Sequence, residues 1–257
     1  MFITTAHNCS FEIEHKAKEL AEEFAYKYIN RKNYSLSQLK RDVGDREVVV
    51  VEDKGLKFVG QDDLVFFFHP NLAKIRITSL LKGFSDRLWK ISRVESGHTV
   101  LDCTMGLATD SIVFSFLVGE KGKVIALESE TVPYLLGREG LRNYNSGVAE
   151  IDSAMRRISS IHEDHLEYMK SLPDKSFDIV YFDPMFRRPT NTIALTPLRS
   201  IANNFAIKTE AIIEAKRIAR KKVILKERKE SGEFERLGFE LIVNKKGSSF
   251  DYGVIES

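Results

Sequence analysis

The sequence has few cysteines and almost no excess of charge. Its two cysteines among 257 residues, Cys9 and Cys103, lie far apart in the chain and do not predict a disulfide. Lysine and arginine total 39 against 37 aspartate and glutamate, so the net charge of +2 does not by itself indicate a nucleic-acid partner. No secretory leader is recognisable, and no apolar run approaches the roughly 18 residues of a membrane span. We therefore expect a cytoplasmic protein that does not enter a membrane.

Glycine-rich phosphate loops are also absent. The chain contains neither the dinucleotide fingerprint G-x-G-x-x-G nor a Walker-type lysine loop. Both motifs cradle a pyrophosphate with backbone N–H groups, so their absence weakens any prediction of an NAD- or ATP-binding protein. A metal centre is not expected either, because His162 and His165 lack further ligands at a suitable spacing.

The composition and hydrophobic patterns indicate a main α/β domain preceded by a small α/β module. Hydrophobic residues make up 43% of the chain, enough for one sizeable core and a small appended domain. Within residues 1–70, "FITTA" is typical of a strand and residues 11–29 have one apolar helical face. Three short β-like runs follow before residue 70. The role of this module is not evident from its sequence.

Residues 71–95 form a basic, amphipathic connector in which Leu and Ile alternate with Lys and Arg. Two interpretations are equally favoured. The segment is either a solvated helical connector that covers the edge of the next sheet, or a basic face for a phosphate backbone.

From residue 96 to residue 257, strand and helix patterns alternate. The strands are short, β-branched and nearly continuous in hydrophobicity, which predicts a doubly wound, mostly parallel Rossmann-like sheet. The last two strand-like runs, residues 239–245 and 250–256, are joined by "KGSS". This connection is too short for a crossover helix, so we expect an antiparallel C-terminal hairpin at one edge.

Acidic residues follow three successive strands of this predicted sheet. The first strand runs into "DCTMGLATD", which contains Asp102, Thr104, Gly106 and Asp110; Glu128 follows the second strand, and Asp164 the third. Ligands of such sheets bind at the carboxyl ends of the strands. A carboxylate at position 102 suits the ammonium group of S-adenosylmethionine, while Glu128 could accept hydrogen bonds from a ribose diol and Asp164 from an adenine amino group. Each acid alone is also typical of a helix cap.

The fourth strand ends in "DIVYFDPMFRR", in which Asp183-Pro184 is followed by Met185, Phe186, Arg187 and Arg188. The proline stiffens the turn and can hold the Asp183 carboxylate toward the cleft. An aromatic ring at position 186 can stack on a base, and the two arginines can contact phosphates.

These motifs resemble class I S-adenosylmethionine (SAM)-dependent methyltransferases that modify exocyclic amino groups of bases. The chain is most similar to the small-subunit ribosomal RNA guanine-N2 methyltransferase (RsmJ-like) family, on "DCTMGLATD", "ALES", the tetrapeptide Asp183-Pro184-Met185-Phe186 and "VILK" ending in Lys226. The resemblance covers about residues 95–257. Ser129 departs from the family, which has a basic residue there.

The resemblance implies SAM as cofactor, S-adenosylhomocysteine as product, and ribosomal RNA or the small ribosomal subunit as partner, with a homodimer left open. The implied catalytic residues are Asp183, Pro184 and Phe186. The implied cofactor-binding residues are Asp102, Thr104, Gly106, Leu107, Asp110, Glu128, Ser129, Asp164, His165 and Asp183. The implied substrate-binding residues are Met185, Phe186, Arg187, Arg188, Lys226 and Arg228.

Three alternatives remain open from the sequence. The tetrapeptide alone also permits methylation of DNA adenine or cytosine amino groups. A nicotinamide-dependent oxidoreductase is disfavoured by the missing glycines and the closing hairpin. A non-catalytic RNA-binding module would keep its function if Asp183 were replaced by alanine.

Overall fold

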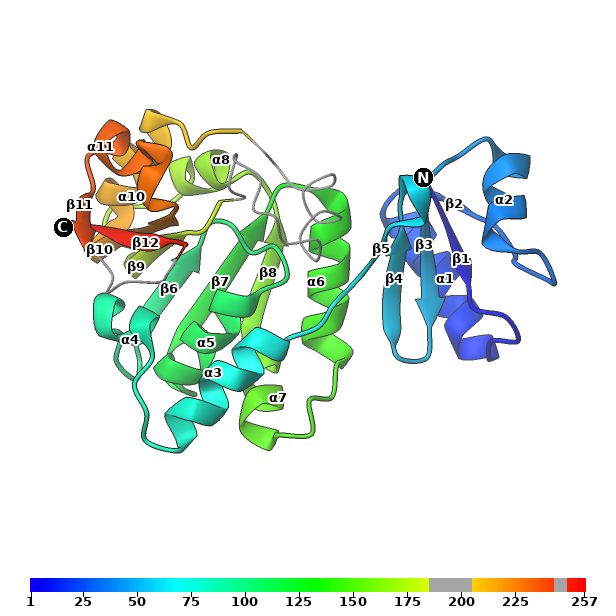
Figure 1. Ribbon diagram of the computed structural model, residues 1–257, viewed down its shortest axis with the longest axis horizontal. Coiled ribbons are helices and arrows are strands. Elements are labelled where there is room, and N and C mark those ends of the chain that lie inside the picture. Colours follow the sequence, from blue (N-terminus) through cyan, green and yellow to red (C-terminus); the bar gives the residue numbers. More distant parts are fainter. Residues whose placement is uncertain (185–204, 243–248) are drawn as a thin grey trace.

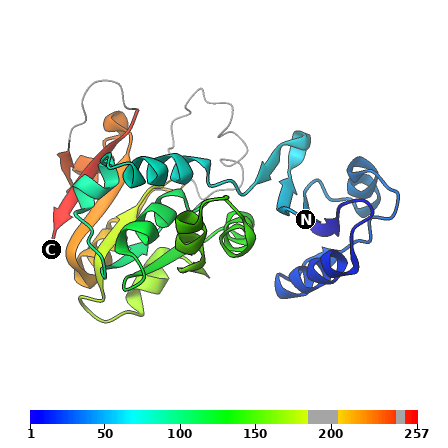
Figure 2. The same ribbon diagram turned by 90° about the horizontal axis from the view of Figure 1, so that it is seen from below.

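The computed structural model describes residues 1–184, 205–242 and 249–257. The chain forms two sheets, shown side by side in Figure 1 and from below in Figure 2. The first sheet is built from residues before position 70, and the second begins at Thr99. All described strands before position 70 belong to the first sheet, and all described strands from Thr99 onward belong to the second.

The N-terminal sheet has the strand order β2-β1-β3-β4-β5, in which β1 pairs in parallel with both β2 and β3. Its strands are β1 (Phe2–Thr5), β2 (Lys27–Tyr28), β3 (Val48–Glu52), β4 (Gly55–Val59) and β5 (Val65–Phe67), and its helices are α1 (Phe11–Glu23), α2 (Leu36–Val43) and the short η1 (Gln61–Asp63). The prediction of one helix over residues 11–29 is wrong beyond Glu23. Ala25 takes a left-handed conformation with φ 54°, and the chain then turns into β2.

The connector of residues 71–95 folds into two helices, α3 (Asn71–Leu81) and α4 (Arg87–Ser92). Its apolar face packs inward through Ala73, Ile77 and Leu88, which are fully buried. Two of its cations form ion pairs within the protein, since Arg76 pairs with Asp86 and Asp110, and Arg87 pairs with Asp251. Those two arginines are therefore engaged inside the protein, which favours the structural interpretation of the connector over a basic face for phosphates.

The second sheet has the strand order β11-β12-β10-β9-β6-β7-β8 among the described residues. Its strands are β6 (Thr99–Asp102), β7 (Lys123–Glu128), β8 (Ile158–His162), β9 (Phe177–Phe182), β10 (Ala219–Glu227), β11 (Glu240–Ile242) and β12 (Asp251–Glu256). β6 to β10 are parallel, and β12 is antiparallel to both β10 and β11. The predicted fold and its antiparallel hairpin are thus confirmed. Because β12 inserts between β10 and β11, the order differs from the 3-2-1-4-5-6 order of dinucleotide-binding sheets.

Helices cover both faces of this sheet. The helices are α5 (Thr109–Val118), α6 (Thr131–Asn143), α7 (Ala149–Arg156), α8 (His165–Lys170), α10 (Thr209–Ile218), α11 (Glu233–Leu237) and the short η3 (Lys229–Ser231). Side chains alternate along each strand: Val100 packs against the α5 side, and the adjacent Leu101 packs against the α8 and α10 side. Burial on both faces explains the nearly continuous hydrophobicity of the strands.

Helix α6 joins the two sheets. Leu135 and Leu136 of α6 lie in the same buried cluster as Ile3 and Val49 of the N-terminal sheet. Phe68, just after β5, lies against Gly140 of α6 and edge-on to Tyr144, with 5.7 Å between the ring centroids. The N-terminal module is therefore packed directly onto the domain that carries the strand ends.

Candidate active site

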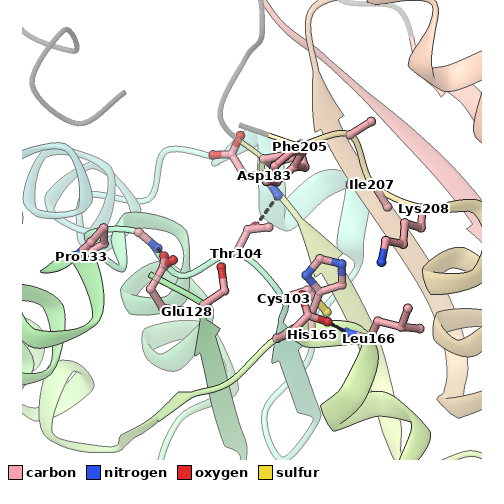
Figure 3. Close-up of a pocket in the computed structure, with 15 residues that line it drawn as sticks. Cys103, Thr104, Glu128, Pro133, His165, Leu166, Asp183, Phe205, Ile207 and Lys208 are labelled. Atoms are coloured by element: carbon pink, nitrogen blue, oxygen red, sulfur yellow. Dashed lines mark hydrogen bonds between the residues drawn. The ribbon is translucent and has the colours of Figure 1, made fainter. Parts of the chain in front are cut away.

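A pocket lies at the carboxyl ends of β6, β7, β8 and β9 (Figure 3). Among the predicted residues, it is lined by Thr104, Gly106, Glu128, Ser129, Asp164, His165, Asp183 and Pro184. The parallel arrangement explains why residues up to 80 positions apart meet here, because the carboxyl ends of neighbouring parallel strands share one edge of the sheet.

The loop after β6 forms the floor of the pocket and is held by backbone hydrogen bonds. Met105 N donates to Leu127 O at 2.7 Å, and Gly106 N donates to Oε2 of Glu128 at 2.9 Å. Gly106 has φ 50°, in the left-handed region that a residue without Cβ adopts at little cost. The glycine therefore turns the backbone toward Glu128 and leaves its own position open to a ligand.

Glu128 is the best-positioned acid for a ribose diol. Its carboxylate accepts from Gly106 N and, at 3.0 Å, from Glu130 N, while it still lines the pocket. Burial raises the pKa of Glu128, although the two backbone N–H groups favour its ionised form. Each carboxylate oxygen can accept a further hydrogen bond, so the side chain is fixed in place and still able to bind hydroxyl groups.

Asp164 and His165 form the next wall of the pocket. The Asp164 carboxylate caps α8 by accepting from Leu166 N at 2.9 Å and Glu167 N at 3.3 Å. The helix-cap role that the sequence allowed is thus present, and the residue also lines the pocket. His165 stands edge-on to Phe182 at 5.6 Å, and burial lowers its pKa, so its ring is neutral near pH 7.

Asp102 lies behind the pocket and is not among the residues that line it. The side chain is 1% exposed, and its carboxylate accepts from Thr104 N at 3.0 Å and from the Ser111 hydroxyl. Burial raises its pKa to about 7. This placement does not suit direct contact with an ammonium group; Asp102 instead holds the loop that carries Thr104.

Asp183 stands at the end of β9, where its backbone N–H donates to Oγ1 of Thr104 at 2.6 Å (Figure 3). Its carboxylate oxygen Oδ2 accepts from Lys226 Nζ at 2.6 Å. Burial raises the pKa of Asp183, and Lys226 opposes that rise. The side chain remains 26% exposed and lines the pocket, so it can accept a hydrogen bond from a ligand.

Two predicted contacts are corrected by this geometry. Asp110 is 5% exposed and paired with Arg76 and Lys226, so it is a buried partner of other side chains and does not line the pocket. Lys226, predicted to bind phosphate, is 15% exposed and pairs with both Asp110 and Asp183. An ammonium group that already neutralises two carboxylates is poorly suited to a phosphate contact.

The remaining predicted residues fall into two groups. Leu107 packs with the buried clusters around α5 and α6 and does not line the pocket, and Arg228 follows β10 outside it. Met185, Phe186, Arg187 and Arg188 lie outside the described residues. The roles assigned to those four therefore remain predictions.

Seven of the residues that line the pocket were not predicted: Cys103, Pro133, Leu166, Phe205, Ala206, Ile207 and Lys208. Phe205, Ile207 and Lys208, at the approach to α10, line the pocket opposite Glu128 (Figure 3). Phe205 is 87% exposed at the pocket mouth. The sequence offers only one signal for them, a lone aromatic residue just before a predicted helix. Without the fold, this signal is too weak to assign these residues to the pocket.

Neither a metal cluster nor a membrane helix is found in the part of the chain that the structure describes. No three His, Cys, Asp or Glu side chains of these residues gather closely enough to hold a metal ion. None of the described helices is long and apolar enough to cross a bilayer.

Comparison with known proteins identifies the family. The model of a family described as "Putative SAM-dependent methyltransferase" matches residues 61–254. The chain belongs to this family of SAM-dependent methyltransferases. Its cofactor is therefore SAM, and the nicotinamide-dependent alternative is set aside.

Individual relatives extend the comparison. The chain is 37% identical over 256 residues to "Uncharacterized protein YpiP" of Bacillus subtilis, covering 99% of both chains, so the N-terminal module is shared with that relative. About half of this methyltransferase (49%) is 32% identical to half (50%) of the ubiquinone/menaquinone biosynthesis C-methyltransferase UbiE of Pseudoalteromonas translucida. A similar part of it (46%) is 30% identical to 43% of the ribosomal RNA small subunit methyltransferase J of Francisella tularensis.

A solved structure confirms the fold of this methyltransferase. The SAM-dependent methyltransferase NGO1261 from Neisseria gonorrhoeae aligns with a TM-score of 0.62 at 17% identity, covering 100% of this chain and 96% of that one. At this level of identity the likeness concerns the architecture.

The pocket of this SAM-dependent methyltransferase fits its cofactor chemically. SAM presents a ribose diol, an adenine amino group and an ammonium group as hydrogen-bond donors, and the pocket offers the carboxylates of Glu128 and Asp164 as acceptors. Apolar surfaces for a flat ring are provided by Pro133, Leu166 and Ile207. The open position at Gly106, where an added Cβ would meet nothing within 4 Å, lets a ligand approach the backbone.

Proposed function

We propose that this methyltransferase modifies an exocyclic amino group of a nucleic-acid base, with guanine N2 of small-subunit ribosomal RNA as the specific substrate. The observation that carries the proposal is the Asp183-Pro184 pair at the end of β9, which borders the same pocket as Glu128 and Asp164. The half-chain similarity to ribosomal RNA small subunit methyltransferase J supports the choice of substrate. Such a substrate would place the enzyme in the cytoplasm.

The residues of the chain would act mainly by orientation. When bound, SAM supplies a methyl group activated by its sulfonium. An aromatic amine is a weak nucleophile, because its lone pair is delocalised into the ring. The Asp183 carboxylate would accept one N–H of this amine and the Pro184 carbonyl the other, which aligns the lone pair with the methyl donor.

The pocket mouth supplies surfaces for the base. Phe205 lines the same pocket as Asp183 (Figure 3) and would add an aromatic surface for a base that has left its helix. Phe186 is proposed for the same task. Neither a metal ion nor a covalent nucleophile is needed, because the chemistry requires orientation and a hydrogen-bond acceptor.

A methylation assay tests the proposal. Purified protein and isotopically labelled SAM are incubated with small ribosomal subunits from cells that lack the gene, with duplex DNA, or with a demethylated quinone. We expect incorporation into 16S ribosomal RNA, and mass spectrometry should locate it at one guanine. Incorporation into DNA or the quinone alone would overturn the proposed substrate.

The role of Asp183 is tested by D183A. Loss of the acceptor should lower turnover by about 10²–10⁴-fold while S-adenosylhomocysteine still binds in calorimetry. D178N is the matched control, since Asp178 lies at the opposite end of β9 and accepts from Thr99 N at 2.8 Å, away from the pocket. Full activity in D183A would exclude this role.

A further inference from the structure

Five charged groups of alternating sign run from the connector to the pocket. Asp86, the N-cap of α4, accepts from Arg76 at 2.8 and 2.9 Å, and Arg76 also donates to Oδ1 of Asp110. Oδ2 of Asp110 accepts from Lys226 Nζ at 3.0 Å, and Lys226 Nζ donates to Oδ2 of Asp183 at 2.6 Å. Each of the three inner groups thus contacts an opposite charge on both sides, and Asp86 and Asp183 at the ends contact one each.

We propose that Lys226 is a positioning residue of this methyltransferase: it fixes Asp183 in its ionised form, with one carboxylate oxygen held and the other left for the substrate amine. The inference rests on the proposed function, because it deepens the role of Asp183. It replaces the predicted phosphate contact of Lys226 with a contact inside the protein.

The position of Lys226 itself is fixed from three directions. Asp110 and Asp183 take two of its three donors, and its ammonium lies 4.9 Å from the centroid of the Phe250 ring. Asp110 in turn accepts from the Tyr181 hydroxyl at 2.7 Å, and Tyr181 is fully buried in β9. Lys226 is therefore held by rigid elements on both sides, as a precisely oriented acceptor requires.

The arrangement divides the two oxygens of Asp183 between two tasks. Lys226 contacts Oδ2, and the backbone N–H of Asp183 is held separately by Thr104. A carboxylate with one oxygen in an ion pair keeps the acceptor capacity of the other, whereas a protonated carboxyl would offer a donor in its place. An amine N–H needs an acceptor, so the charge state of Asp183 matters directly.

Some of the groups around Asp183 raise its pKa and others lower it. The titratable and charged groups that face it or its partners are Asp102 on β6, Asp110 on α5, Lys226 on β10, Tyr181 on β9, Tyr252 on β12 and Arg76 on α3. Burial raises the pKa of Asp183 most, Lys226 lowers it and Asp110 raises it. Removing Lys226 should therefore raise this pKa, and neutralising Asp110 should lower it.

A direct test follows the Asp183 carboxyl by ¹³C NMR over a pH titration, with the resonance assigned by its loss in D183N. In K226Q the midpoint should rise by about one pH unit or more, and in D110N it should fall. K226R should retain the wild-type midpoint. K222Q is the matched control, because Lys222 is also a buried lysine of β10 but pairs with Glu256 at 3.0 Å, away from the pocket.

Methyl transfer to small ribosomal subunits provides the second readout. The rate should fall as the pH drops through the titration midpoint of Asp183. This fall in rate should occur at higher pH in K226Q and at lower pH in D110N. At neutral pH, K226Q should lose about 10–100-fold in kcat with little change in KM for SAM. K226R should recover most of that loss, and K222Q should match the wild type.

The outcomes separate the inference from the proposed function. If the NMR midpoint of Asp183 is unchanged in both K226Q and D110N, the inference is wrong whatever the substrate proves to be. If the midpoints move as expected but the wild type methylates no RNA, the pairing holds and the proposed substrate fails. Should K226Q fail to fold, D110N decides: a midpoint that rises or stays constant overturns the inference.

Discussion

The contact between Gly140 and Phe68 gives a quantitative test of how the N-terminal module is attached. An alanine methyl at position 140 would lie 2.0 Å from Cγ of Phe68, which is 6% exposed. Carbon atoms in contact prefer about 3.5–4.0 Å, so the ring would have to move by about 1.5 Å. Such a movement would remove it from its place beside Tyr144.

The magnitude follows from two opposing terms. Displacing a buried phenylalanine ring costs up to about 3–5 kcal/mol, whereas replacing a helical glycine with alanine stabilises by about 0.5–1 kcal/mol. We therefore expect G140A to lower the free energy of unfolding by about 2–4 kcal/mol. Urea unfolding followed by circular dichroism measures this difference.

The double variant supplies the control. In F68A the ring is absent, so adding G140A should stabilise the protein slightly, by about 0.5–1 kcal/mol. The two substitutions should thus be coupled by about 3 kcal/mol. If G140A costs as much in the F68A background as in the wild type, the reasoning from this contact is refuted.

Three further predictions concern the pocket and its supports. G137A should weaken S-adenosylhomocysteine binding about tenfold or more in calorimetry, because its methyl would lie 3.1 Å from the backbone oxygen of Gly106. Burial raises the pKa of Asp102 to about 7, so the folded state binds this proton more tightly than the unfolded state does. The free energy of unfolding should therefore fall as the pH rises from about 4 to about 7. In D102N, urea unfolding should show this fall reduced by up to about 4 kcal/mol. R76M should cost about 3 kcal/mol, because it leaves Asp110 with one fewer cation.

Each of these predictions has a clear contrary result. Unchanged affinity of G137A for S-adenosylhomocysteine would show that the loop around Gly106 adapts to the methyl group. Equal pH dependence of stability in the wild type and D102N would show that the Asp102 carboxyl is ionised without cost. For R76M the control is K18M, which removes an exposed partner of Glu14 and should cost far less, because solvent screens that pair. Equal losses in the two variants would contradict the buried role of Arg76.

Most of the sheet and part of the pocket could be predicted from the sequence. Strands buried on both faces have an unmistakable run of apolar residues, and parallel pairing places the residues after them together. On this basis Glu128, Asp164 and Asp183 were expected at the strand ends, where they line the pocket, and the roles assigned to them stay predictions. Helix α7 was missed, because its pattern merges with the run that leads into β8.

The partners of charged side chains could not be predicted, because they come from distant parts of the chain. Asp110 meets Arg76 and Lys226, which lie 34 and 116 residues away. Nothing in the local sequence distinguishes a lysine that faces solvent from one that lies between two buried carboxylates. The start of α2 differs, because its capping pair Ser35 and Gln38 is a local signal, although it stands within a polar stretch.

The pairing of Arg76 with Asp110 has a consequence for how this protein can be divided. A fragment beginning at residue 96 would keep all described strands of the larger sheet but lose Arg76, leaving Asp110 with Lys226 as its remaining cationic partner. The balance of charge at Asp183 would then change, although no residue that lines the pocket had been removed. A segment that is exchanged as a unit between homologues, in evolution or in engineering, must therefore begin before α3. Chimaeras joined after the connector should fold more readily than they catalyse the reaction.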